Sequence, residues 1–81
     1  MADIMALRGI LAENKRKFRN KRLEAKGIIL LMNELINPYE DEIEKTNAAQ
    51  IKTYAEKLEQ LVNEIKELKE KIDAMESDLN G

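Results

Sequence analysis

Residues 51–79 read IKTYAEKLEQLVNEIKELKEKIDAMESDL, and this stretch decides the fold. Its apolar positions alternate spacings of three and four residues without interruption: Ile51, Tyr54, Leu58, Leu61, Ile65, Leu68, Ile72, Met75 and Leu79. A heptad repeat of this kind places its apolar residues on one stripe of a helix, and that stripe is buried against another helix. Residues 51–79 are therefore predicted to form a helix that packs against a second helix.

The beginning of this helix is predicted at the only proline of the chain. The run Asn37-Pro38-Tyr39-Glu40 combines an N-cap residue, a proline at the first helical position and a glutamate three residues after the cap. Pro38 also disfavours helical geometry at Asn37, so a preceding helix should end near Ile36. These signals predict a helix over about 3–36, a bend near 37–38 and a helix over about 38–79.

The first predicted helix carries a less regular version of the same repeat. Asp3 is its expected N-cap, and two glycines lie inside it, at Gly9 and Gly27, where each costs about 1 kcal/mol relative to alanine. We call the stripe of residues on the buried face of each helix its seam. The seam of the first helix has polar residues at Asn14 and Lys21. The remaining seam positions are Ile4, Leu7, Leu11, Phe18, Ala25, Ile28, Met32 and Leu35.

The two seams match if the chain folds back at residues 37–38. The resulting antiparallel register pairs Met32 with Ile43, Phe18 with Leu58, Leu11 with Ile65, Leu7 with Leu68 and Ile4 with Ile72. In this register Met75 and Leu79 extend beyond the first helix, and Lys21 lies near Tyr54. The predicted fold is an all-α antiparallel helical hairpin that forms a single domain over residues 1–81. A parallel coiled-coil dimer through the second seam is the alternative, because Glu64 to Lys69 and Lys71 to Glu76 supply opposite charges beside that seam.

Self-association is expected, because two helices in a chain of 81 residues bury little apolar surface. Residues 28–36 carry more apolar side chains than one helix face can hide, which favours a homodimer of hairpins packed as a four-helix assembly. The overhanging end of the second helix offers a further apolar surface, to a second copy or to another protein partner. The predicted self-association residues are Ile28, Leu30, Leu31, Leu35, Ile36, Met75 and Leu79.

A basic stripe marks the first helix. Residues 13–26 hold seven basic residues against two acidic ones, a local charge of +5. Four of the basic residues follow helical spacing on one face, a geometry that can track phosphates. These four nucleic-acid candidates are Lys15, Arg19, Arg22 and Lys26.

The alternative interpretation pairs these cations with the acidic second helix. The predicted register brings Arg19 near Glu56 and Arg16 near Glu59. The net charge of −2 and the lack of a recognition-helix turn favour this internal pairing over nucleic-acid binding.

The composition argues against an enzyme. Without histidine or cysteine, the chain lacks the usual general base, thiol nucleophile and zinc ligands. The acidic residues Glu40, Asp41, Glu42 and Glu44 would occupy the first turns of the predicted second helix, where its positive end favours them without a metal. We expect a non-enzymatic structural or protein-interaction module with no catalytic residue, metal or cofactor.

Cytoplasmic localisation and the absence of a membrane span are also expected. The longest apolar run, residues 28–32, is far shorter than the roughly 20 residues that cross a bilayer. The first residues lack the basic start and long apolar stretch of a secretory signal.

The layout of the chain resembles that of small uncharacterised helical-hairpin proteins encoded in Mu-like prophages. The resemblance lies in the basic first arm, the bend sequence Asn37-Pro38-Tyr39-Glu40-Asp41, and Ala55-Glu56-Lys57-Leu58-Glu59-Gln60-Leu61 leading into a heptad helix. It implies a bacterial prophage source and carries over no functional residues.

Overall fold

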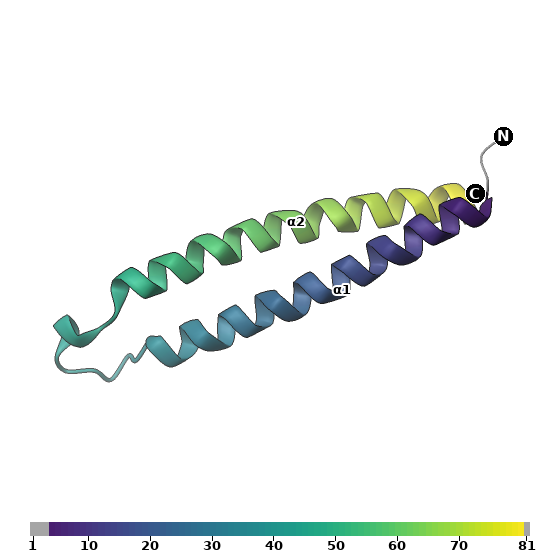
Figure 1. The fold of residues 1–81 in the computed structure, drawn as a ribbon. Helices are drawn as coiled ribbons and strands as arrows, with labels where there is room; N and C mark the ends of the chain where they lie inside the picture. Colours follow the sequence, from purple (N-terminus) through teal and green to yellow (C-terminus); the bar gives the residue numbers. More distant parts are fainter. Residues whose placement is uncertain (1–3, 81) are drawn as a thin grey trace.

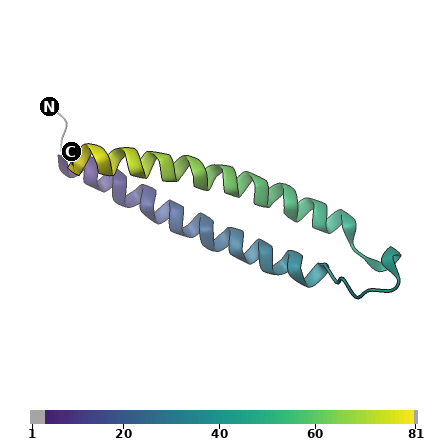
Figure 2. The same cartoon turned by 180° about the vertical axis from the view of Figure 1, so that it is seen from behind.

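The computed structural model of this chain describes residues 4–80 and is an antiparallel helical hairpin. Helix α1 spans Ile4–Leu35, a short 3-10 helix η1 spans Ile43–Lys45, and helix α2 spans Ala48–Asn80. The two long helices lie side by side in a rod of 65 × 17 × 14 Å, with the connecting loop at one end and both chain ends at the other (Figures 1 and 2). The predicted all-α hairpin is confirmed, and the expected cap Asp3 lies outside the described residues.

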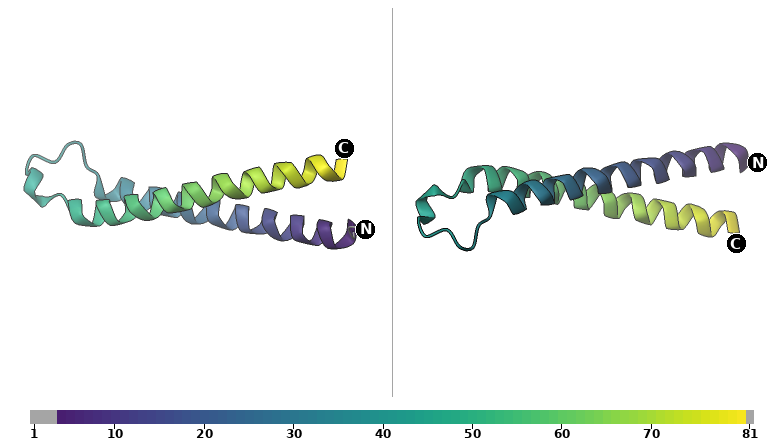
Figure 3. Two further views of the ribbon diagram at one scale, coloured as in Figure 1. Left: turned by 90° about the horizontal axis from the view of Figure 1, so that it is seen from above. Right: turned by 90° about the horizontal axis from the view of Figure 1, so that it is seen from below.

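The predicted seams form the contact between the helices. All nine seam positions of α2 are buried or half-buried, and in α1 only Ile4 of the predicted seam is exposed. The centre of the contact is a cluster of Ala25, Ile28 and Leu61, against which Met32, Tyr54, Leu58 and Ile65 pack. The helices cross gently when viewed from above or below (Figure 3). Because α1 covers the seam of α2, this seam is not free to form the parallel coiled coil weighed above.

The prediction that the second helix begins at Pro38 is wrong. Residues 36–47 form a connection instead of a tight bend, and α2 begins ten residues later, at Ala48. Asn37 uses its side chain in a turn, in which its Oδ1 accepts a hydrogen bond from the Tyr39 N–H at 3.0 Å and its carbonyl accepts from the Glu40 N–H at 3.3 Å. The residues suited to a helix start therefore make an Asn-Pro turn.

The N-cap of α2 is Asn47. Its Oδ1 accepts from the Gln50 N–H at 3.2 Å, and its Nδ2 donates to the Gln50 Oε1 at 2.9 Å, an arrangement related to the capping box. Asn37-Pro38-Tyr39-Glu40 and Asn47-Ala48-Ala49-Gln50 are thus two competing cap sequences. The second one is used because an apolar seam begins directly after it, whereas Ile43 in the intervening segment is exposed. Packing of an apolar face stabilises a helix more than its cap does.

The predicted register is also wrong, by roughly three helical turns. Phe18, expected opposite Leu58, lines the same cavity as Ile72. Leu61 packs in the cluster with Ala25 and Ile28, whereas the predicted pairs Phe18–Leu58 and Leu11–Ile65 would place it near Asn14. The shift follows from the longer connection, which moves the beginning of α2 along the chain.

The shifted register also removes the predicted overhang. Leu7, Met75 and Leu79 line one small cavity of about 40 Å³ at the open end of the rod. Ile72, one of the four buried residues of the part of the chain that is described, lies in the contact between the helices. The end of α2 therefore completes the hairpin itself and offers no overhanging stripe to another protein.

Candidate interaction surfaces

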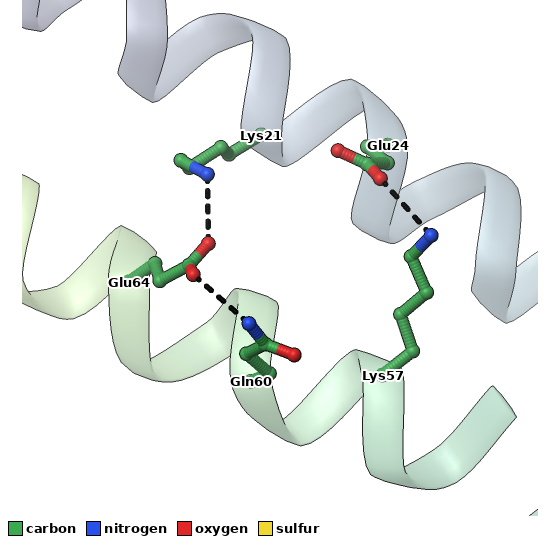
Figure 4. A network of polar contacts seen from close by, with 5 residues as sticks. All are labelled: Lys21, Glu24, Lys57, Gln60 and Glu64. Carbon is green, nitrogen blue, oxygen red and sulfur yellow. Dashed lines mark hydrogen bonds and ion pairs between the residues drawn. The ribbon is translucent and has the colours of Figure 1, made fainter. Parts of the chain in front are cut away.

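Two polar residues on the seam of α1 have partners on α2. The Lys21 Nζ lies 2.7 Å from the Glu64 Oε2, and the Gln60 Nε2 donates to the other Glu64 oxygen at 3.3 Å (Figure 4). The Asn14 Nδ2 lies 3.6 Å from the Met75 sulfur, a weak contact. Lys21 therefore contacts Glu64 instead of Tyr54, the partner that was predicted. Both contacts fit the observed alignment of α1 with α2.

The Lys21–Glu64 ion pair makes the stability of the hairpin depend on pH. The hydrogen bond from Lys21 lowers the pKa of the Glu64 carboxyl below its usual 4.5 and raises the pKa of Lys21. In the unfolded chain Glu64 therefore takes up a proton at a higher pH than in the folded one. The contribution of the Lys21–Glu64 pair to stability is present above about pH 4.5. It is lost as the pH falls through the lower pKa that Glu64 has in the folded chain.

We expect thermal melts of the wild-type protein and of Glu64→Gln to differ at pH 6 and to converge towards pH 3. The Glu67→Gln variant, changed on the exposed face of α2, is the control and should follow the wild type. A constant difference between wild type and Glu64→Gln over the whole range would contradict the role of the pair.

The basic stripe of α1 is only partly neutralised by α2. Lys15 Nζ lies 2.7 Å from the Glu76 Oε1. The predicted pairs of Arg19 with Glu56 and of Arg16 with Glu59 are wrong, because Arg16 binds Glu13 on its own helix and Arg19 has no ion pair among the described residues.

The other three residues of the basic stripe are Arg19, Arg22 and Lys26, and they lie close together on α1. The Arg22 guanidinium lies over the Phe18 ring at 5.5 Å from its centroid, a cation–π contact. Arg22 also lines a shallow hollow of about 250 Å³ together with Arg19, Leu23 and Lys26. Among residues 4–80 neither Arg22 nor Lys26 forms an ion pair, so these cations are available to an anionic partner.

Most of the exposed large apolar side chains lie on α1, with Ile4, Met5 and Ile10 near its start and a larger group near the loop. The most exposed large apolar side chain of α2 is Val62, with 36 % of its surface exposed. By contrast, α1 and the residue after it expose five between positions 23 and 36, each by 45 % or more: Leu23, Ile29, Leu30, Leu31 and Ile36. Two of these five, Ile29 and Ile36, also line a groove of about 220 Å³ between the helices, together with Met32, Asn33 and Leu58.

The structure separates the predicted self-association residues into two groups. Leu30, Leu31 and Ile36 are exposed on the apolar surface near the loop. The others belong to the contact between the helices: Ile28 is buried, and Leu35, Met75 and Leu79 are half-buried. Leu23 was not predicted, and Ile29 lies in the predicted apolar range 28–36 but not among the predicted self-association residues. Leu23 precedes Leu30 by seven residues, so a second heptad spacing on the outer face was the signal that could have found it.

The described residues show no sign of a metal centre or of a membrane span. No group of three or more acidic side chains within residues 4–80 could hold a metal ion. In the same range neither helix has the length and apolarity that crossing a bilayer requires.

Comparison of this chain with protein-family models, with curated proteins and with solved structures finds no match. The resemblance to prophage hairpin proteins therefore stays a prediction.

Proposed function

We propose that this protein is a non-enzymatic interaction module that self-associates through the outer surface of α1. The observation that supports this is the uneven exposure of its two helices. The seam of α2 is covered by α1, whereas α1 has a second apolar surface that α2 does not cover. A second copy that covers this surface removes apolar area from water, which stabilises a chain whose own core is small.

The test is the oligomeric state of a double variant, Leu30→Glu with Leu31→Glu. Two carboxylates on the exposed apolar surface should leave the helical content unchanged, because neither side chain is buried in the hairpin. Sedimentation equilibrium should give about twice the mass of the chain for the wild type and the monomer mass for the variant.

The control for this experiment is Ile10→Glu, an exposed isoleucine near the other end of α1. This variant should remain dimeric. A wild-type protein that is monomeric at millimolar concentration would reject self-association.

Nucleic-acid binding is the second candidate function. The observation that favours it is the unpaired state of Arg19, Arg22 and Lys26 within the described hairpin, where pairing with α2 was expected. The i, i+3 and i+7 spacing of these cations along one face repeats at intervals that suit consecutive phosphates.

Fluorescence anisotropy with duplex DNA, single-stranded DNA and RNA at several salt concentrations tests this candidate. Binding should weaken steeply with salt, and Gln at Arg19, Arg22 and Lys26 should reduce the slope of log affinity against log salt by about 0.9 for each lost contact with duplex phosphates. Gln at Lys52, Lys66 and Lys71 of α2 removes the same charge and should change little. If no binding is detected at low salt, this function is rejected.

A further inference from the structure

Gly27 lies on the outer face of α1, at a position where no contact within the hairpin requires a glycine. Gly27 is inside a continuous helix, and none of the described glycines has a positive φ. A Cβ placed on Gly27 would meet nothing within 4 Å. Glycine is unfavourable in a helix interior, so its presence here has no explanation within one chain.

Two exposed leucines flank this glycine along the helix. Leu23 and Leu30 are exposed by 67 % and 65 %, more than any other large apolar side chain in this half of α1. They are seven residues apart, which puts them on one face, two helical turns from each other. Gly27 lies between them, where the missing side chain leaves the backbone open to close approach.

Charge along α1 and the loop changes sign around this site. Residues 8–26 contain eight basic and two acidic side chains, whereas residues 34–44 contain five acidic side chains and no basic one. A parallel pair of α1 helices would place the basic segments side by side. An antiparallel pair places the basic segment of each copy beside the acidic segment of the other, which electrostatic complementarity favours.

We propose that two copies pair antiparallel through the outer faces of α1, with the crossing point at Gly27. Each Leu23 then packs against Leu30 of the other copy. Arg19 precedes Leu23 by one turn and Glu34 follows Leu30 by one turn, so Arg19 of each copy lies beside Glu34 of the other. Neither Arg19 nor Glu34 forms an ion pair within the described hairpin, so both remain available for this contact. This inference rests on the self-association proposed above and specifies its geometry.

A charge exchange tests the orientation. Arg19→Glu and Glu34→Arg should each weaken dimerisation about tenfold in sedimentation equilibrium, because each creates two like-charge contacts in a two-fold dimer. The double variant should return to within about threefold of the wild type. A double variant no tighter than the single ones would overturn the antiparallel contact.

A distance measurement tests the same point independently. The chain has no cysteine, so Ala12→Cys can be labelled uniquely with a nitroxide. With the crossing at Gly27, the two labels of an antiparallel dimer should be about 45 Å apart by electron–electron dipolar spectroscopy. A parallel dimer would place them within roughly 20 Å, and that result would overturn the proposal.

The role of Gly27 is tested against Gly9, the other exposed helical glycine with no atom near an added Cβ. At a protein concentration low enough for the chain to be monomeric, glutamine at either position should raise the thermal stability of the hairpin, because it is a better helix former. Only Gly27→Gln should weaken dimerisation, by about tenfold or more. Equal affinities of the two variants would reject the close approach at Gly27. A wild-type protein without any dimer would reject self-association as a whole, whereas a dimer with short label distances would reject only this geometry.

Discussion

The Leu61→Ala variant should lose about 2–4 kcal/mol of unfolding free energy. Leu61 is 5 % exposed and packs with Ala25 and Ile28 in the centre of the hairpin. Only four residues of the described chain are buried, so each large one contributes a large share of a small total stability. The truncation removes apolar contacts and leaves a cavity that a two-helix contact can only partly close.

The neighbouring Val62→Ala variant is the matched control for Leu61→Ala. Val62 is on the same helix turn but 36 % exposed, so its truncation should cost less than about 1 kcal/mol. Urea unfolding followed by circular dichroism at 222 nm measures both variants. Protein concentration must be equal in all samples, because the proposed dimerisation would add to the apparent stability. Equal losses for the two variants would show that Leu61 is not at the centre of the contact.

Truncation of the chain after Lys71 should destabilise the hairpin by roughly 3–5 kcal/mol. The truncated chain loses the buried Ile72 and the half-buried Met75 and Leu79, which cover Leu7 and Phe18 at the open end. It also loses the Lys15–Glu76 ion pair, but this exposed pair contributes little.

Hydrogen exchange measured by NMR shows where this loss acts. Amides in the first half of α1 should lose protection, whereas those around Ala25 and Ile28 should keep more of theirs. The Ile72→Ala variant separates loss of packing from shortening of the chain, and it should reproduce a large part of the effect. A truncated protein as stable as the full chain would contradict the register of the hairpin and support an overhanging α2.

Much of the hairpin could be predicted from the pattern of apolar residues. All seam positions of both helices except Ile4 proved to be buried or half-buried, including the polar residues Asn14 and Lys21. The end of the first helix was predicted near Ile36 and is found at Leu35, because the steric effect of Pro38 on Asn37 is local. These features depend on neighbours in sequence, which a single sequence shows directly.

The start of α2 could not be chosen from local signals. Asn37 and Asn47 each begin a plausible cap sequence, and the decision between them depends on what the following residues can pack against. Residues 38–46 have four acidic side chains and no apolar face that meets α1, so they form a loop and η1 instead of a helix.

The candidate surfaces were predicted only in part. Leu30, Leu31 and Ile36 were expected to be exposed and are, but the register error placed Met75 and Leu79 outside the hairpin. Which cations of the basic stripe have partners also depended on register, since a shift of three turns replaces every residue opposite them. Arg19 therefore lost its expected partner.

The apolar pattern predicts two amphipathic helices and the buried face of each, because these properties follow from the 3.6-residue period of the helix. The register depends on contacts between the two helices. A helix makes three turns in about eleven residues, so a seam shifted by eleven residues presents its apolar face in the same direction. Apolar periodicity therefore fits both registers, and the longer loop, together with pairs such as Lys21 with Glu64, selects one of them.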